Sequence, residues 1–217
     1  MGPSSLPGDG IGGGRARRVV DIAGALVAGV VAVPLMAVIA IAVRANLGRP
    51  VLFIQERAGK DGRPFRLYKF RSMTNARDAT GALLPDADRT PAFGRFLRRT
   101  RLDELPELWN ILIGDMSVVG PRPILPDTVA SMGAAGAQRS SIRPGLTGWA
   151  QVSGNASLTN ADKLALDLWY IDHRSLRLDI RILLETLRLI ASGDRIDAAR
   201  VETALRSQPE RSRPDRQ

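Results

Sequence analysis

The residues best suited to chemistry in this sequence are two adjacent carboxylates, Asp103 and Glu104. The chain has no cysteine and a single histidine, His173, which disfavours thiol nucleophiles, cysteine-based zinc sites and a serine–histidine triad. An ionised aspartate is a competent nucleophile toward a phosphoryl group. Chemistry at this pair therefore depends on carboxylates, lysines and arginines.

Both carboxylates lie at the expected start of a helix that runs from Thr100 or Asp103 to Gly114. Adjacent residues of a helix diverge by about 100°, so one carboxylate can attack while the other serves a metal. The N-terminus of a helix also keeps a carboxylate ionised and attracts phosphate. The simpler interpretation is an ordinary cap, with Thr100 and Asp103 at capping-box spacing, and both interpretations stay open.

Basic side chains surround the carboxylate pair in the sequence. Arginine forks and lysine point charges suit a diphosphate, although most such side chains are simply solvated. The basic residues near the pair are Lys69, Arg71, Arg98, Arg99, Arg101, Arg122 and Arg143. With so few nitrogen and sulfur ligands, the metal to expect is a hard cation held by carboxylate and phosphate oxygens, and Mg²⁺ is the natural choice.

The composition indicates one domain with an anionic partner. The chain has 217 residues, of which 44% are hydrophobic, enough for a core. Its net charge of +9 implies nucleic acid, anionic lipid or a phosphorylated substrate. Aromatic residues make up 5% of the chain, which is few for a protein that stacks single-stranded bases.

An apolar segment without a formal charge extends from Ile22 to Val43. It is long enough to cross a bilayer, but Pro34 lies at its middle, where it kinks or breaks a helix. Arginines flank both ends, and the positive-inside rule places both ends in the cytoplasm. A helix that enters the membrane, breaks at Pro34 and returns satisfies both observations, provided that other protein groups cover the freed backbone.

Three other interpretations of this segment stay open. It can be an ordinary spanning helix, because proline is tolerated in such helices. It can be a cleaved signal peptide, since Ala40–Ala42 offers a small-residue cleavage site. It can also be the buried core helix of a soluble protein.

Short elements follow the apolar segment. Two strands, Val51–Gln55 and Phe65–Phe70, are joined by a turn at Gly59–Gly62, which predicts a hairpin. The stretch from Thr74 to Pro91 is loop-like. An amphipathic helix carries Phe93 to Arg99, and further helices are expected at Asp162–Ile171 and Ile180–Ser192. The helix at Phe93–Arg99 can rest on anionic headgroups, or its basic face can simply be solvated. The helix at Ile180–Ser192 can also lie at a membrane interface, or it can be an ordinary amphipathic core helix.

The chain resembles the monotopic phosphoglycosyl transferases, the bacterial sugar transferase family, in motifs that occur in order from about Arg17 to Ile190. The matching stretches are Arg17–Asp21, Gln55–Gly59, Tyr68–Met73, Leu102–Asn110, Gly114–Pro123, Arg143–Val152 and Asp167–Tyr170. This set is highly specific. One departure is Val33-Pro34, where the family often has Ser-Pro. Another is Ser153–Asn155, where many relatives have an Asn-Gly-Arg-Asn-like run, so a substrate contact can differ there.

The sequence and the resemblance together imply an α+β, mainly helical fold. It combines an N-terminal re-entrant membrane helix, a small β-hairpin and amphipathic interfacial helices. We expect a disordered leader at 1–14, the re-entrant helix at 15–46, the catalytic phosphoglycosyl transferase domain at 47–195 and a polar, largely disordered tail at 196–217. Larger relatives carry extra N-terminal spanning helices and a further domain, so this chain looks like the minimal catalytic form.

The resemblance also implies a ping-pong reaction on a UDP-sugar. Asp103 attacks the sugar-linked phosphate and forms a covalent intermediate, releasing UMP, while Glu104 holds Mg²⁺ against the diphosphate. A polyprenyl phosphate, expected to be undecaprenyl phosphate, then accepts the phosphosugar. Substrate contacts are expected from Lys69, Arg71, Arg101, Arg122, Arg143 and Asp167.

The implied setting is the cytoplasmic face of a bacterial inner membrane, at the first membrane step of a glycan pathway such as exopolysaccharide biosynthesis. The expected partners are a UDP-sugar, polyprenyl phosphate and anionic lipids, with no nucleic acid; a homodimer is left open. The main rival is a non-catalytic, basic, membrane-tethered module that binds lipid or nucleic acid. That rival explains the charge and the apolar segment but not the ordered motifs.

Overall fold

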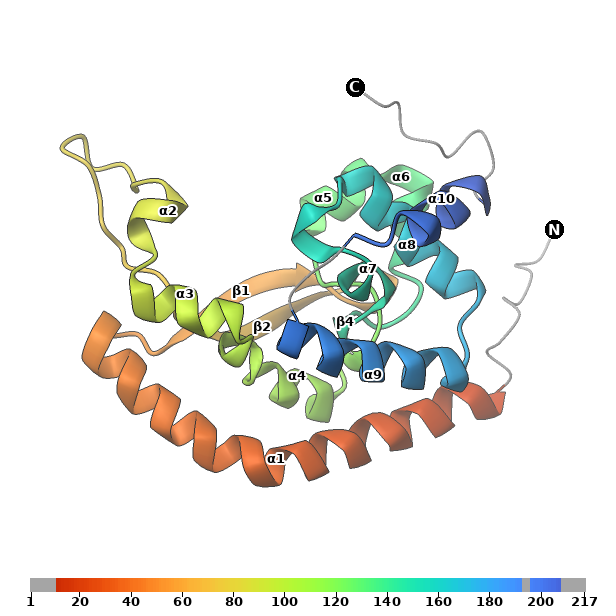
Figure 1. Cartoon of the computed structure of the whole chain (residues 1–217), viewed down its shortest axis with the longest axis horizontal. Helices are drawn as coiled ribbons and strands as arrows, with labels where there is room; N and C mark the ends of the chain where they lie inside the picture. The colour runs from red at the N-terminus through yellow and green to blue at the C-terminus, as the bar shows by residue number, and fades with distance from the viewer. Residues whose placement is uncertain (1–10, 193–195, 208–217) are drawn as a thin grey trace.

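The computed structural model describes residues 11–192 and 196–207. It is mainly helical with two small sheets, which confirms the predicted α+β class (Figure 1). The α-helices are α1 (Ile11–Leu47), α2 (Asp86–Arg89), α3 (Ala92–Arg99), α4 (Glu107–Ile113), α5 (Pro126–Ser131), α6 (Gly133–Arg139), α7 (Trp149–Val152), α8 (Asn160–Asp172), α9 (Leu176–Ser192) and α10 (Ala198–Ser207). The strands are β1 (Leu52–Ala58), β2 (Pro64–Phe70), β3 (Ser117–Val119) and β4 (Gly145–Thr147), and the 3-10 turns are η1 (Lys60–Gly62), η2 (Leu102–Glu104) and η3 (Asn155–Ser157).

Helix α1 lies as a bowed rod along one side of the domain (Figure 1). Ala25, Ala32 and Ile39, spaced seven residues apart, are buried against the domain, whereas most of the large apolar side chains of α1 are exposed. Only 17% of its most apolar stretch is buried. This exposure disfavours a core helix of a soluble protein. By length and composition, α1 is the one helix of the described residues that is long and apolar enough to cross a membrane.

The structure shows no interruption at Pro34, where the sequence predicts a kink or a break: α1 is helical from Ile11 to Leu47 with Pro34 inside it. Proline removes one hydrogen bond and crowds the preceding turn, which bends a helix without ending it. The helix also begins four residues before the predicted start at Arg15. Gly12, Gly13 and Gly14 lie in this extension, and each glycine in a helix costs about 1 kcal/mol relative to alanine. A helix that is already nucleated can nevertheless extend through a few glycines. The rest of the predicted leader, residues 1–10, lies outside the described residues.

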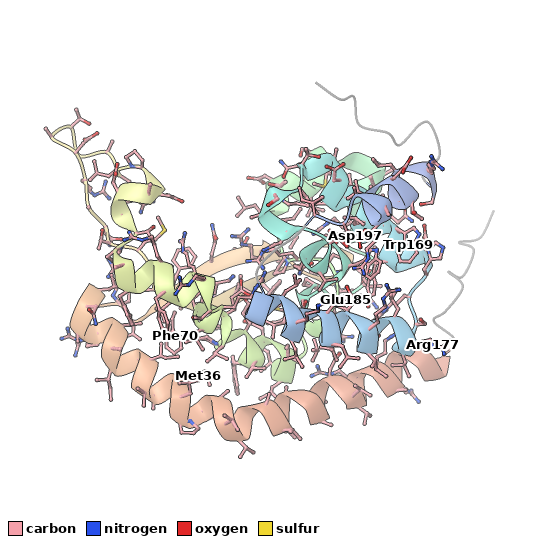
Figure 2. All side chains as sticks on the ribbon, in the orientation of Figure 1. Met36, Phe70, Trp169, Arg177, Glu185 and Asp197 are labelled. Carbon is pink, nitrogen blue, oxygen red and sulfur yellow. The ribbon has the colours of Figure 1, made fainter. Side chains whose placement is uncertain are left out.

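Both ends of α1 are fastened to the same domain. Near the N-terminal end, Arg17 pairs with Asp179 of α9 at 3.1 Å, and Asp21 accepts the Ser117 hydroxyl at 2.9 Å. At the other end, Arg71 donates to the backbone carbonyls of Leu47 and Arg49. Between these ends, Met36 packs beside Phe70 of β2 (Figure 2). The domain therefore covers one side of α1 along most of its length.

The predicted hairpin is confirmed, with β1 and β2 antiparallel. Strand β1 continues three residues beyond the predicted end, to Ala58, because polar Glu56 and Arg57 alternate across its faces as a strand requires. Asp61 and Gly62 take left-handed conformations in the turn. In this register Phe53 faces Lys69 and Arg57 faces Phe65, which places these four side chains on one face of the hairpin.

A second, parallel sheet joins β3 to β4 and has no strong signal in the sequence. Each strand has only three residues, too few to display a period of two. The strands sit close to the Gly120 loop: a Cβ on Gly145 would lie 2.1 Å from the Gly120 nitrogen. A glycine is therefore required at this crossing.

The predicted disordered tail is wrong over residues 198–207, which form α10 and pack against α8. Val201, Ala204 and Leu205 form an apolar stripe at helical spacing, and Ala204 is fully buried. Arg200 lies 4.2 Å from the centre of the Trp149 ring and pairs with Glu185 and Asp197. Glu185 and Asp197 lie close together in Figure 2. This stripe is short and surrounded by charges, and residues 208–217 lie outside the described residues.

We predict that Gly94→Ala destabilises the protein. Gly94 of α3 approaches Ser72 so closely that an added Cβ would lie 1.9 Å from the Ser72 carbonyl oxygen, so α3 must move. Overpacking of this kind costs about 1–3 kcal/mol, or roughly 2–4 °C in Tm per kcal/mol. Gly24→Ala is the matched control, because its Cβ would meet nothing within 4 Å. Thermal unfolding in detergent measures both, and equal Tm values for the two variants would contradict the close packing at Gly94.

Candidate active site

The adjacent carboxylates lie in η2, a tight turn between α3 and α4, and not at the start of the predicted helix. Arg101 has a left-handed backbone (φ 55°), which separates the end of α3 from η2. The predicted capping box is wrong, because the Thr100 hydroxyl donates to the carbonyls of Phe96 and Leu97 in the preceding helix. Helix α4 begins only after Pro106, which occupies its cap.

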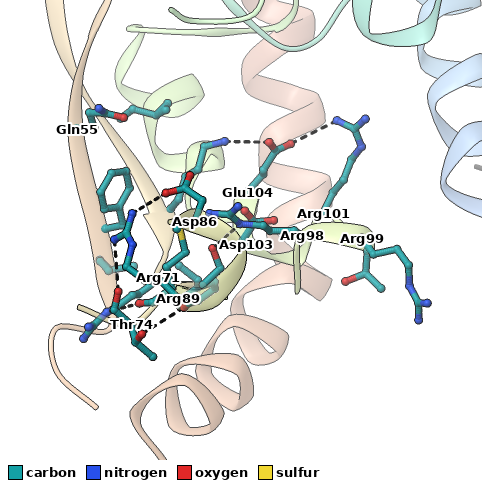
Figure 3. A pocket seen from close by; sticks show the side chains of 18 of the residues that line it. Gln55, Arg71, Thr74, Asp86, Arg89, Arg98, Arg99, Arg101, Asp103 and Glu104 are labelled. Atoms are coloured by element: carbon teal, nitrogen blue, oxygen red, sulfur yellow. Dashed lines mark hydrogen bonds and ion pairs between the residues drawn. The ribbon is translucent and has the colours of Figure 1, made fainter. Parts of the chain in front are cut away.

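Asp103 and Glu104 line a cavity of about 1100 Å³ formed by the hairpin, the 71–75 segment, α3 and η2. Figure 3 shows both carboxylates at its centre, with Arg98, Arg99 and Arg101 close by. The cations that line the cavity are Arg57, Lys69, Arg71, Arg89, Arg98, Arg99, Arg101 and Arg122, and the acids are Asp86, Asp103 and Glu104. This excess of positive charge suits an anionic ligand.

The environment of Asp103 raises the pKa of its carboxyl. Burial is the main cause, the charge of Glu104 adds to it, and Lys69 and Arg98 oppose it. The sequence predicted that a helix N-terminus would favour ionisation, but Asp103 precedes α4 in a separate turn. A more basic carboxylate is a stronger nucleophile once ionised, so this environment is compatible with attack on an electrophile.

Glu104 is held as a carboxylate by two cations. Its Oε1 accepts from Lys69 Nζ at 2.9 Å and from Arg122 at 2.7 Å. Burial would raise the pKa of Glu104, but the charges and hydrogen bonds of Arg122 and Lys69 outweigh burial and lower it to about 2. Lys69 also lies 3.0 Å from Glu107. Burial raises the pKa of Glu107 to about 7, the charge of Glu104 adds to the rise, and Lys69 and Arg122 oppose it only in part.

Four predicted binding residues line the same cavity as the carboxylates: Lys69, Arg71, Arg101 and Arg122. Their roles toward a substrate stay predictions. Arg71 is also a structural anchor, because its guanidinium donates to three backbone carbonyls, two of them at the end of α1.

Arg143 and Asp167 do not line this cavity, so their expected substrate contacts stay predictions. Arg143 donates to the Gly114 carbonyl and lines a separate small pocket near the start of α1. Asp167 is buried in α8 and pairs with Arg139 at 2.8 Å, and Arg139 donates to the Arg122 carbonyl. Asp167 therefore positions Arg122 indirectly, through Arg139. The motif placed it near the site but did not reveal its partner.

The sequence also missed cavity residues. Gln55 and Arg57 belong to a recognised motif, and a period of two on β1 would have placed them on one face. Arg98 was noted as basic but given no role, although it contacts Ser72 beside Asp103. Asn155 also lines the cavity, on a backbone with positive φ of 43°. The sequence marked Ser153–Asn155 only as a departure from the family and gave Asn155 no role. Glu107 belongs to the recognised stretch Leu102–Asn110 but was not assigned its contact with Lys69.

The donor set allows a metal only with help from a ligand. Within residues 11–192 and 196–207, no cluster of three acidic or histidine side chains could hold a metal ion. Mg²⁺ commonly binds through one or two carboxylates, several waters and substrate phosphates. Glu104 is ionised, and its Oε2 is 3.7 Å from the nearest Arg101 nitrogen. The site therefore fits Mg²⁺ if a phosphorylated substrate supplies the other ligands.

Comparison with known proteins gives a consistent result. Residues 13–193 match the family described as bacterial sugar transferase. The chain is 45% identical to an uncharacterized sugar transferase, EpsL, of Bacillus subtilis over 76% of this chain and 81% of that protein. It is 38% identical to the UDP-N-acetylgalactosamine-undecaprenyl-phosphate N-acetylgalactosaminephosphotransferase of Aeromonas hydrophila, over 82% of this chain and 44% of that protein.

A third relative is the UDP-glucose:undecaprenyl-phosphate glucose-1-phosphate transferase of Xanthomonas campestris pv. campestris. The identity is 42%, over 70% of this chain and 34% of that protein. The chain therefore spans less than half the length of these last two relatives.

We predict that Glu107→Gln flattens the dependence of stability on pH. The pKa of Glu107 rises from 4.5 to about 7 on folding, so protonation of Glu107 stabilises the folded state relative to the unfolded state. This contribution is complete below about pH 4.5 and is lost as pH rises through 7, with a slope of at most about 1.4 kcal/mol per pH unit. The depressed pKa of Glu104 acts at lower pH and does not interfere. Melting curves from pH 5 to 8 test this, and parallel profiles for wild type and variant would contradict it.

Proposed function

Because the chain belongs to the bacterial sugar transferase family, we propose that it transfers a phosphosugar from a UDP-sugar to a polyprenyl phosphate, with undecaprenyl phosphate as the expected acceptor. The observation that carries the proposal is the Asp103–Glu104 pair in a large cavity rich in cations. Two relatives named as transferases of sugar phosphates to undecaprenyl phosphate support the same activity. UMP is the expected second product.

In the proposed first half-reaction, a carboxylate oxygen of Asp103 bonds to the sugar-linked phosphorus. The bond from that phosphorus to the bridging oxygen breaks, and UMP leaves with the electron pair. In the second half-reaction, an oxygen of the lipid phosphate attacks the same phosphorus, and the Asp103 carboxylate leaves. The positive charges of Lys69 and Arg98 favour the ionised form of Asp103. Hydrogen bonds from Lys69 and Arg122 hold Glu104 beside it.

We further propose that Glu104, together with substrate phosphate oxygens, holds Mg²⁺. Its low pKa keeps it ionised at neutral pH, as a ligand to a hard cation must be. When bound, the ion would neutralise part of the charge of the diphosphate.

The attachment of α1 supports a re-entrant position on the cytoplasmic face of the bacterial inner membrane. Asp21 near one end and Leu47 at the other both bond to the same domain, which has no other candidate span among the described residues. If the domain stays on one side of the bilayer, both ends of α1 must lie on that side. By the positive-inside rule, the flanking arginines favour the cytoplasm as that side.

Apolar side chains on two further helices support a domain that rests on the membrane surface. Trp109 and Ile113 of α4 are exposed, as are Ile180, Leu184 and Leu187 of α9. Helices α4 and α9 lie near α1 in Figure 1. Exposed apolar faces on amphipathic helices favour burial at a lipid interface, and basic residues nearby favour anionic headgroups.

We predict that Asp103→Asn abolishes a covalent phosphosugar adduct, because an amide lacks the nucleophilic oxygen. The protein is incubated with a panel of UDP-sugars and Mg²⁺, and its intact mass is measured. UMP release with polyprenyl phosphate should fall by roughly 10³-fold or more. Asp86→Asn is the matched control, since Asp86 lines the same cavity but is exposed and pairs with Arg89. An adduct that persists in Asp103→Asn would place the nucleophile elsewhere, and no UMP release by wild type on any sugar would contradict the proposed activity.

We predict that cysteines introduced at positions 15 and 49 react from the same side of the membrane. The native chain has no cysteine, so each single-cysteine variant carries one label. A membrane-impermeant maleimide should label both variants in inverted vesicles and neither in intact spheroplasts. A cysteine at the exposed position 206 marks the side of the domain. Labelling of positions 15 and 49 from opposite sides would establish an ordinary spanning helix.

A further inference from the structure

The motif Gln55–Gly59 has no role in the reaction described so far, yet two of its side chains line the cavity. Gln55 and Arg57 are two residues apart on β1 and therefore share a face. The pairing with β2 puts Lys69 on the same face. One wall of the cavity thus carries a glutamine, an arginine and a lysine; Gln55 is the wall residue labelled in Figure 3.

The Arg57 guanidinium is oriented within the wall. Its Nη2 donates to Gln55 Oε1 at 2.6 Å. The next residue, Ala58, donates its backbone N–H to the Ile124 carbonyl at 2.9 Å, which ties the end of β1 to the loop that carries Arg122. Arg57 and Arg122 therefore approach the cavity from two connected segments, and both line it.

The charge of Arg57 is not balanced in the ligand-free protein. Among the described residues, its side chain makes one hydrogen bond, to neutral Gln55, and no ion pair. Its buried Nε–H has no hydrogen-bond partner there. Burial and the positive charge of Arg122 lower the pKa of Arg57, and Glu107 offsets this only in part. A structural arginine would normally be paired with a carboxylate or with several carbonyls.

We infer that Arg57, oriented by Gln55, binds a phosphate oxygen of the substrate and forms with Lys69 and Arg122 one phosphate-binding wall of the cavity. An anion beside Arg57 and Arg122 would relieve their repulsion, and a guanidinium fork suits phosphate oxygens. This inference rests on the proposed function for the identity of the ligand. The donor diphosphate and the acceptor phosphate share the required chemistry.

The first test measures binding without turnover, so its result does not depend on the proposed reaction. Inorganic pyrophosphate is titrated against the full chain in detergent, and its Kd is obtained from the shift in Tm. Arg57→Met should weaken binding by about 10- to 100-fold, because a charge-assisted hydrogen bond is lost. Arg66→Met is the matched control: Arg66 is exposed on the same hairpin, lies opposite Glu56 in the strand register and does not line the cavity. Its Kd should equal that of wild type.

A second readout separates ligand binding from a structural role. Arg57→Met removes a half-buried charge that has no ion-pair partner among the described residues, so the ligand-free Tm should stay the same or rise. A lower ligand-free Tm with an unchanged Kd for pyrophosphate would overturn the inference. If Arg57→Met does not fold, Arg57→Gln decides the question, because glutamine stays polar but removes the positive charge. A wild-type Kd for pyrophosphate in Arg57→Gln would then overturn the inference.

The two phosphate sources are distinguished by repeating the titration with a UDP-sugar and with a short-chain polyprenyl phosphate. Weaker binding of the UDP-sugar alone assigns Arg57 to the donor, and weaker binding of the lipid phosphate alone assigns it to the acceptor. A loss with both ligands indicates one position used in turn. Unchanged affinity for both would overturn the inference. If wild type binds these ligands but releases no UMP, the proposed reaction fails while the assignment of Arg57 stands.

Discussion

A buried cluster of charges at Lys69 holds the candidate site together. Lys69 of β2 contacts both Glu104 of η2 and Glu107 of α4, and Arg122 joins from a proline-flanked loop. Three segments far apart in the sequence thus meet at the carboxylate of Glu104. Removing one partner from a buried ion pair typically costs 3–5 kcal/mol, because the other charge is left uncompensated. The position of Asp103, the neighbour of Glu104, follows from this cluster.

The cluster is supported from behind by a second buried ion pair. Asp167 of α8 fixes Arg139 of α6, and Arg139 donates to the carbonyl of Arg122. The orientation of Arg122 toward Glu104 therefore depends on a carboxylate that never reaches the cavity. Asn110 adds a further connection, since its side chain bonds to the backbone of both Arg66 and Tyr68. Polar side chains thus lock α4 and α8 to the hairpin and to the loop that form the cavity.

Local patterns in the sequence predicted the helices and strands with strong periodic or turn signals. The start of α4 and the presence of α10 depend on backbone conformation and long-range contacts that local patterns do not show. The apolar run of α1, the hairpin and the helix at Phe93–Arg99 have strong periodic or turn signals, and all three are present. The start of α4 was misplaced because a left-handed Arg101 cannot be read from residue type alone. Helix α10 was missed because its stability comes from contacts with α8 and Trp149.

The same division applies to the candidate site. The motifs identified Asp103, Glu104, Lys69 and Arg122, which do meet in one cavity. They did not distinguish a residue that faces the cavity from one that supports it, as Asp167 shows. Both roles need a buried charged side chain, so only the partner and the direction of the side chain separate them.

The location of the cavity relative to α1 gives the proposed reaction its geometry. Pro50, Leu52 and Phe53 follow α1 almost directly and line one part of the cavity, and Leu52 and Phe53 are exposed apolar residues. In the proposed topology this part lies at the membrane surface, where the tail of a lipid phosphate can remain in the bilayer. The cationic walls extend from there toward Asp103. In the proposed reaction, a bowed helix fastened at both ends would thus let Asp103 meet a soluble nucleotide and a lipid phosphate on the same side of the membrane.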